Sequence, residues 1–297
     1  MKKKIILLLL TGVLLTSCNR ENETIAPEQS VTDEAFMAPT SELLCNYVDS
    51  YWPFSAVLKS GLKTVADTNF MLSEIKKNAS LWGEITPPLK FVYAPRDPEG
   101  TYNAASYADG KIYYGYEIYY DAKSKSADNI VNAMILAHEY GHQLQYKYAL
   151  PSVKEETVRS TDLEADGFAG YYLRKPAGFN KSNFSQIAAA YEFAAAIGDN
   201  QITSKGHHGT PAQRRTAVRL GFLLGEFTLT AKDFDSQFFH YYSSVLNGTD
   251  PDLTPSSAST FKFNQEIDRK IQAHMSELKD IYTEKISAEQ FKTINTN

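Results

Sequence analysis

Two histidines four residues apart, with a glutamate directly after the first, make up the stretch best suited to chemistry. The segment is ILAHEYGHQLQ, and the residues are His138, Glu139 and His142. On an α-helix the two histidines lie one turn apart on one face, close enough to bind one tetrahedral metal ion. Glu139 projects about 100° around the helix, where it can reach a metal-bound water without binding the metal. The spacing is that of the H-E-x-x-H zinc helix.

The alternative is a buried helix whose histidines form internal hydrogen bonds. Apolar and small residues lie on or beside the histidine face, and these are Ile130, Met134, Ala137 and Gly141. Gly141 costs a helix about 1 kcal/mol relative to alanine, which indicates that another part of the molecule approaches the backbone closely. This glycine favours the metal helix over the alternative.

A catalytic zinc site needs a third protein ligand and a fourth position for water. The segment TDLEADGFAG, on the next predicted helix, supplies Asp162, Glu164 and Asp166. Asp162 and Asp166 share a helical face, while Glu164 points away from that pair. Geometry favours Asp162 as the ligand only weakly, and Asp166 would then orient a ligand histidine. A solvated acidic face is the alternative for this segment.

Four ordered blocks carry a family resemblance. They are HEYGHQLQ, DLEADGFAGYY, AAAIGDNQI and HGTPAQRR. In order and approximate spacing they resemble the bacterial neutral zinc metallopeptidase family, a gluzincin-like group, and the match covers roughly residues 88–226. The resemblance implies Zn²⁺ as cofactor and places the third ligand at Asp162 and its acidic partner at Asp166. The family has glutamate where this chain has Asp162, one methylene shorter, which leaves open whether Asp162 or Glu164 is the ligand.

The last block resembles an element that related proteases bring to the active site. The resemblance implies that His208 donates a hydrogen bond to the developing oxyanion, with His207 as the rival donor. Arg214 would pair with an acidic residue such as Asp166 or anchor its helix. For either histidine a helix-capping or surface role is the alternative. His240 and His274 are expected to be structural.

These parts imply an endopeptidase mechanism on a polypeptide substrate. Glu139 would take a proton from the metal-bound water as it attacks the peptide carbonyl, and would then deliver that proton to the leaving amine. In relatives the peptide lies extended along the edge of a small sheet. The segment YNAASYADGKIYY is assigned to that edge as a hypothesis.

The N-terminus has the features of a lipoprotein secretion signal. Three lysines precede the apolar run Ile5 to Leu15, and the run ends in Leu15-Thr16-Ser17-Cys18, which resembles a lipobox. We therefore expect residues 1–17 to be removed and Cys18 to carry lipid. The expected localisation is the bacterial cell envelope, anchored to a membrane, with the inner or outer membrane left open. The polar residues 18–40 are predicted to be a flexible tether.

Charge and cysteine content exclude several classes. Without the three signal-peptide lysines the chain carries 27 basic and 35 acidic side chains, which argues against a nucleic-acid partner. Cys45 is then the remaining thiol and is expected to be buried and unreactive. A thiol enzyme is the weakest alternative, because Cys45 lies far along the chain from every histidine motif. The sequence leaves the oligomeric state open.

Residues 41–297 are predicted to form one α+β domain, a mainly helical zincin-like unit with a small antiparallel sheet before the H-E-x-x-H helix. The metal-site core would span about 88–226, followed by a helical part over 227–297. Apolar spacing predicts two or three helices over 41–77, and strands are expected around Phe91 and Tyr113 with an Asp109-Gly110 hairpin turn. Further helices are predicted over 127–148, 153–174, 184–197 and 211–225, with two more beyond residue 234.

Three readings of function follow. The leading one is a lipid-anchored zinc endopeptidase. The second is an inactive metal-binding protein, such as a chaperone of envelope proteins. The third is a lipoprotein whose tyrosine-rich sheet binds a peptide or carbohydrate, with a structural histidine helix. A structural role in the core is the alternative for the five crowded tyrosines, which are Tyr113, Tyr114, Tyr116, Tyr119 and Tyr120.

Overall fold

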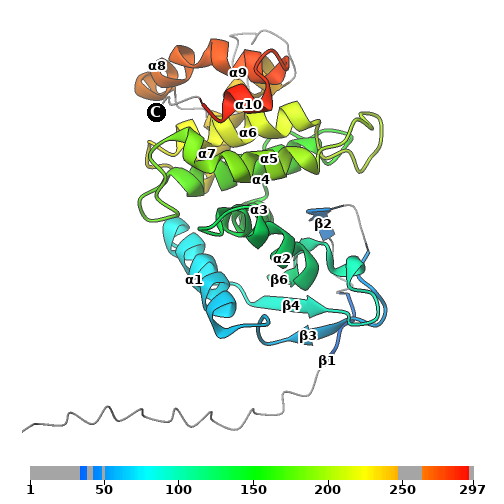
Figure 1. Cartoon of the computed structure of the whole chain (residues 1–297). Helices are drawn as coiled ribbons and strands as arrows, with labels where there is room; N and C mark the ends of the chain where they lie inside the picture. The colour runs from blue at the N-terminus through cyan, green and yellow to red at the C-terminus, as the bar shows by residue number, and fades with distance from the viewer. Residues whose placement is uncertain (1–33, 39–42, 49–50, 247–262, 294–297) are drawn as a thin grey trace, which may run out of the picture. The chain divides into compact units, whose positions relative to one another are not determined.

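The computed structural model describes residues 34–38, 43–48, 51–246 and 263–293 (Figure 1). The predicted signal peptide, Cys18 and most of the predicted tether lie outside the described residues. The strands are β1 (Glu34–Ala35), β2 (Leu43–Asn46), β3 (Val57–Lys59), β4 (Leu89–Tyr93), β5 (Ala104–Tyr107) and β6 (Ile112–Gly115). The helices are α1 (Val65–Trp82), α2 (Tyr116–Ser124), α3 (Ile130–Tyr148), α4 (Arg159–Arg174), α5 (Ala188–Ala196), α6 (Pro211–Leu224), α7 (Ala231–Leu246), α8 (Gln265–Ala273), α9 (Met275–Tyr282) and α10 (Ala288–Phe291), with 3-10 turns η1 (Glu99–Thr101) and η2 (Phe184–Ile187). The α+β class is confirmed.

The sequence predicts an antiparallel sheet, and this prediction is wrong because the sheet is mixed. Its strand order is β1-β3-β4-β6-β5-β2, and β4 pairs parallel with β6. The chain leaves β4, passes η1 and enters β5 beyond the position of β6, so that the return strand β6 runs in the direction of β4. The predicted hairpin is present between β5 and β6, and Gly110 in its turn has a φ of 83°, which suits glycine.

The tyrosine-rich segment is shorter as a strand than its composition suggests. Strand β6 ends at Gly115, and α2 begins at Tyr116. Four of the five crowded tyrosines are buried, namely Tyr113, Tyr114, Tyr116 and Tyr119. They therefore belong to the core, and the structure offers no open tyrosine platform within these residues.

The prediction of helices over 41–77 is wrong for its first part. Residues 43–46 and 57–59 are strands, and α1 is the one helix among the residues of this range that the structure describes. Short apolar runs fit either period, and here pairing of β2 with β5 and of β3 with β4 decided the outcome. The end of the predicted tether is also part of the sheet, because β1 pairs with β3 and Phe36 is buried against Tyr113 with ring centroids 5.0 Å apart.

Helix α3 lies between the sheet and the group of helices α4 to α7 (Figure 1). It contacts α1 and β5, and it packs on α4 and α5 (Figure 1). A Cβ at Gly141 would lie 3.2 Å from the Cα of Ala165, so this glycine is where α4 approaches α3, as its presence in the helix indicated. On the other side of α4, a Cβ at Gly221 of α6 would lie 1.9 Å from the carbonyl oxygen of Gly167. Glycines therefore set the close spacing of α3, α4 and α6.

A helix boundary differs from its prediction where a backbone group forms a hydrogen bond with a loop and not within the helix. Helix α4 begins at Arg159, not near Val153, because the N–H of Val158 bonds to the carbonyl of Lys205 over 3.1 Å. Helix α6 starts as predicted, with Thr210 as N-cap in a capping box and Pro211 in its first turn. Beyond α6 the described chain has more helices than the two expected.

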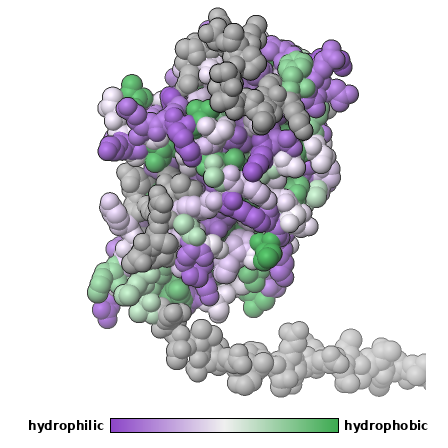
Figure 2. Space-filling model, turned by 180° about the vertical axis from the view of Figure 1, so that it is seen from behind, coloured by the Kyte–Doolittle hydropathy of each residue, from purple (hydrophilic) through white to green (hydrophobic). Residues whose placement is uncertain are grey.

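On the face shown in Figure 2, hydrophobic residues form small separate groups among hydrophilic ones. None of the helices in the described residues has the length and hydropathy that crossing a membrane requires.

Candidate metal centre

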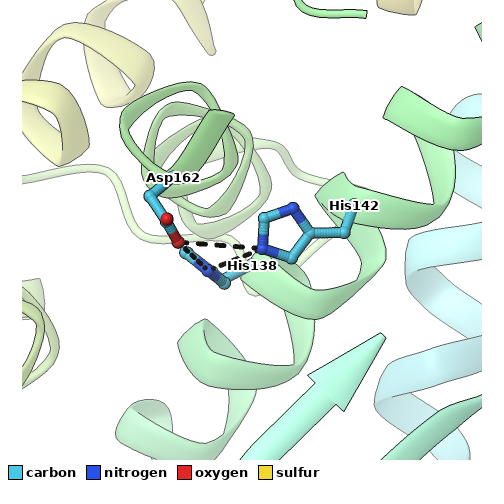
Figure 3. A group of neighbouring side chains, drawn as sticks. All are labelled: His138, His142 and Asp162. Atoms are coloured by element: carbon cyan, nitrogen blue, oxygen red, sulfur yellow. Dashed lines mark hydrogen bonds and ion pairs between the residues drawn. The ribbon is translucent and has the colours of Figure 1, made fainter. Parts of the chain in front are cut away.

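Three side chains from two helices converge in the interior. His138 and His142 project from α3, and Asp162 projects from the first turn of α4 (Figure 3). All three are fully buried, and their potential ligand atoms lie within 4.8 Å of one another. In the part of the chain that the structure describes, this is the group of histidine, cysteine and acidic residues that can hold a metal ion.

The distances fit a small tetrahedral ion. The Nε2 atoms of His138 and His142 are 3.1 Å apart, and Oδ1 of Asp162 lies 3.4 Å and 3.8 Å from them. Ligand atoms bound at 2.0–2.1 Å to a tetrahedral zinc ion are about 3.4 Å apart. Two imidazoles and one carboxylate suit zinc or a similar transition metal better than Ca²⁺ or Mg²⁺, which prefer oxygen ligands. The group is therefore suited to bind a metal ion of this kind.

A second layer of contacts fixes the ring of His138. Its Nδ1 lies 2.9 Å from Oδ1 of Asp166, and a carboxylate accepts, so Nδ1 carries a hydrogen and Nε2 is the ring nitrogen that faces the site. Arg214 donates to Asp166 through Nε and Nη2, over 2.7 Å and 2.9 Å. The predicted contacts of Asp166 with a histidine of the H-E-x-x-H helix and with Arg214 are thus present.

Gln145 plays the same part for His142. Its Oε1 lies 2.7 Å from Nδ1 of His142, while its Nε2 donates to the carbonyl of Thr161 and to Oε2 of Glu164, both over 2.8 Å. The amide nitrogen thus faces two acceptors, and the amide oxygen accepts from Nδ1 of His142. The other ring nitrogen of His142, Nε2, therefore faces the site. Glu164 is therefore a buried partner of Gln145 and lies outside the metal group.

Of the two carboxylates left open by the sequence, Asp162 is the one beside the histidines. Its Oδ1 faces both Nε2 atoms, and its Oδ2 lies 2.9 Å from Nδ1 of His208. Aspartate is short, so α4 must lie close to α3. Gly141 on α3 has no side chain, so α4 can approach α3 there. The nearest residue of α4 is Ala165, one turn after Asp162.

The two histidines differ in pKa when no metal is bound. Burial opposes a charge on His138, but its hydrogen bonds with Asp162 and Asp166 outweigh burial and raise its pKa to about 9. Burial and the charge of His138 lower the pKa of His142 to about 4. Burial opposes the charge of Asp162 as well, yet His208 and His138 hold its pKa well below the usual value. The site thus carries an anionic ligand, a neutral imidazole and a protonated one.

Glu139 has the surroundings of an acid–base group. It is fully buried, and neither carboxylate oxygen has a hydrogen-bond partner among the described residues. Burial raises its pKa to about 8, with repulsion from Asp162 adding to the rise and attraction to His138 opposing it. The backbone of Glu139 is tied to the sheet, since Ser106 Oγ donates to its carbonyl over 2.8 Å. A carboxyl with a pKa near neutrality can both accept and donate a proton.

The loop before α6 brings in both remaining motif histidines. Asp199 accepts from Nδ1 of His207 over 2.7 Å and from the backbone N–H of His208 over 3.0 Å. His208 therefore reaches the metal group, while His207 is used to fix the loop. Arg214 lies on α6 directly after this loop. His274 bonds Glu277 and His240 packs on Tyr241, both away from the site, as expected for structural residues.

Sequence reasoning missed Tyr47 and Gln145. Tyr47 is 1% exposed, its ring meets that of His138 edge-on at 4.9 Å, and the guanidinium of Arg214 lies 5.3 Å from its ring centre. No motif marks Tyr47, because it lies more than 90 positions before His138. Gln145 is seven residues after His138, two turns along the same helix, and that spacing was a usable signal.

Comparisons of this chain with models of known families, with curated proteins and with solved structures give no match. The proposals below therefore depend on the residues of the site and on the motif resemblance described above.

Proposed function

We propose that this protein is a zinc-dependent endopeptidase, held at a membrane of the bacterial cell envelope by lipid on Cys18. The observation that carries the proposal is the pairing of a buried His138–His142–Asp162 group with Glu139, whose carboxylate oxygens have no hydrogen-bond partner within the described chain. A purely structural helix pair would leave the cost of burying that carboxylate unexplained.

The ligands and their partners would hold the ion as a rigid unit. When bound, zinc supplies Lewis acidity that polarises a peptide carbonyl and lowers the pKa of a water molecule. Asp166, Gln145 and His208 hold His138, His142 and Asp162 respectively through hydrogen bonds. These contacts fix the orientation of each ligand side chain before the metal binds.

Glu139 would move the proton. It accepts a proton from the attacking water and then passes that proton to the amine leaving group, which its pKa near neutrality allows. We assign the donor to the developing oxyanion to Nε2 of His208, whose Nδ1 already bonds Asp162. The polypeptide would lie extended along β5, which is tied to the backbone of Glu139 through Ser106.

The test compares the unaltered protein with Glu139→Gln. Both are purified without chelator, their zinc content is measured by elemental analysis, and hydrolysis of unfolded casein is followed. We expect about one zinc per chain in both, since Glu139 is not a ligand, and a loss of hydrolysis of at least about 100-fold in the variant. Equal hydrolysis by the two proteins, or no zinc in either, would refute the proposal.

A metal-binding protein without hydrolytic activity is the second candidate. Full burial of the ligands and of Glu139 favours it, because a polypeptide cannot reach groups with no exposed surface. In that case casein remains intact with both proteins, while each still carries zinc. An inactive chaperone of this kind would be expected to suppress casein aggregation equally with glutamate or glutamine at position 139.

A further inference from the structure

The expectation that the segment YNAASYADGKIYY forms the edge of the sheet is wrong, because another part of the chain pairs along β5. Strand β2 pairs antiparallel with β5, with Leu43 opposite Tyr107 and Asn46 opposite Ala105. Strand β2 is thereby the end strand of the sheet, and β5 has neighbours on both sides. An extended polypeptide that adds to a sheet uses the same backbone groups of the edge strand. Strand β2 therefore occupies the place that the proposed substrate needs.

The residues after β2 continue this contact up to the metal group. The N–H of Tyr47 donates to the carbonyl of Ala104 over 2.9 Å, and the N–H of Val48 donates to Oδ1 of Asn103 over 3.1 Å. The Tyr47 ring then lies edge-on to His138 at 4.9 Å and stacks near Phe193 at 6.3 Å. An aromatic ring thus covers the imidazole of a metal ligand.

The ligands are closed off in this arrangement. His138, His142, Asp162 and Glu139 are all 0% exposed. If they hydrolyse a polypeptide, a segment that covers them must first move. Residues 43–48 pair along β5 and also contact His138. Their movement would therefore expose the pairing positions of β5 and the metal group together.

We propose that residues 43–48, here called the N-terminal strap, are an internal inhibitor that an extended polypeptide displaces from β5. This inference rests on the proposed function, because it concerns access to the same site. The strap pairs with the backbone groups of β5 that an added peptide strand would use.

The strap is held weakly enough to be released. Its pairing with β5 has a register shift between Leu43 and Cys45, so the ladder is irregular. Within the described sheet it has a neighbour on one side only. A short edge strand with an interrupted ladder opens at lower free energy than the strands inside a sheet. A competing peptide with a regular ladder can replace it.

Peptide binding without hydrolysis tests the strap directly. In a Glu139→Gln background, the affinity for fluorescently labelled unfolded casein is measured for Tyr47→Ala, which removes the ring, and for Val48→Pro, which removes the N–H that bonds Asn103. We expect both variants to bind casein at least about tenfold more tightly, because casein no longer has to displace a stably bound strap. Extraction of zinc by dipicolinate should also be faster. Tyr51→Ala, at a nearby tyrosine that is 91% exposed, is the matched control and should match the parent.

Tyr47→Phe separates the strap from a chemical role of the hydroxyl. The phenyl ring keeps the packing on His138, so this variant should bind casein and release zinc like the parent. A second measurement uses Glu139→Gln with the strap unaltered, so that casein is not cleaved: saturating casein should increase hydrogen exchange of residues 43–48 and leave 104–107 protected. Unchanged affinity in both strap variants, or strap amides that stay protected under saturating casein, would overturn the proposal.

The outcomes for strap and enzyme can be told apart. With glutamate at position 139, Tyr47→Ala should cleave casein with a lower KM than the parent. Tighter casein binding with stoichiometric zinc but no cleavage by any variant would support the strap and reject the endopeptidase. Cleavage by the parent with an unchanged KM in Tyr47→Ala would support the endopeptidase and reject the strap. Circular dichroism confirms that each variant is folded.

Discussion

Arg214 and Asp166 form a bidentate ion pair in which both side chains are fully buried. Since Oδ1 of Asp166 also accepts from Nδ1 of His138, this pair connects α6 to His138 on α3 through α4. We expect Arg214→Lys to lower zinc affinity about 10- to 100-fold, because lysine cannot keep the two parallel hydrogen bonds. Competition with a chelating dye measures the affinity. Arg215→Lys, at the neighbouring arginine that pairs with Glu192 near the surface, is the control and should keep the parent affinity.

The ligand set predicts which alanine variants lose the metal. His138→Ala, His142→Ala and Asp162→Ala should be purified with little zinc, because each removes one of the three side chains that we propose as ligands. Glu164→Ala should keep about one zinc per chain, since Glu164 bonds Gln145 and not the ion. Elemental analysis of the four proteins decides the matter. Zinc that persists in Asp162→Ala and disappears in Glu164→Ala would show that the other carboxylate is the ligand.

Gly141 sets the reach of Asp162. A side chain at position 141 would press on Ala165 and Phe168 at 3.2 Å and force α4 to shift by a few tenths of an ångström. The short aspartate then has to span a longer distance, so we expect Gly141→Ala to weaken zinc binding about tenfold while the protein remains folded. Zinc titration and thermal unfolding of the same samples measure both properties. A variant with unchanged zinc affinity would mean that helix spacing does not limit the site.

Zinc uptake should release protons in a pH-dependent way. The pKa of His138 is raised to about 9 in the metal-free site, so this imidazole is protonated at pH 7 and must lose its proton to become a ligand. Affinity for zinc is therefore expected to rise with pH up to about 9 and to level off above it. At pH 7 calorimetry in buffers of different ionisation enthalpy should detect about one proton released per zinc. Asp166→Asn, which removes one of the carboxylates that raise this pKa, should release fewer.

Helix α9 is held on α6 by a pair that predicts acid sensitivity. Glu277 accepts from Nε of Arg219 over 2.6 Å and bonds His274. Burial opposes its charge, but His274 and Arg219 outweigh burial and lower its pKa to about 2. The pair therefore stabilises the fold fully above the ordinary glutamate value of 4.5, and this stabilisation is lost as the pH falls from there to about 2.

The variant Glu277→Gln measures that contribution. We expect its free energy of unfolding to be about 1–2 kcal/mol lower than that of the parent at pH 7, after allowance for partial solvent screening. The difference should shrink towards pH 2, where the parent carboxylate is protonated as well. Urea unfolding at several pH values gives the comparison. A difference that is constant with pH would mean that packing, not charge, accounts for it.

The sequence by itself determined the chemistry-bearing helix and its acidic neighbour. A four-residue spacing places His138 and His142 on one helical face whatever surrounds them, and Thr210-Pro211 fixes a helix start through local hydrogen bonds. Gly141 indicated a close contact, because a glycine lowers the stability of a helix and is expected where no side chain fits. Such features depend on residues a few positions apart, where backbone geometry is enough.

Tertiary structure alone decided which carboxylate meets the histidines, how the sheet is ordered and what covers the site. The choice between Asp162 and Glu164 depends on the rotation of α4 against α3, and that rotation follows from packing across Gly141 and Gly221. The parallel pairing of β4 and β6 and the strand state of residues 43–46 depend on partners far along the chain. Tyr47 reaches His138 only because β2 pairs with β5, a long-range contact that no local pattern encodes.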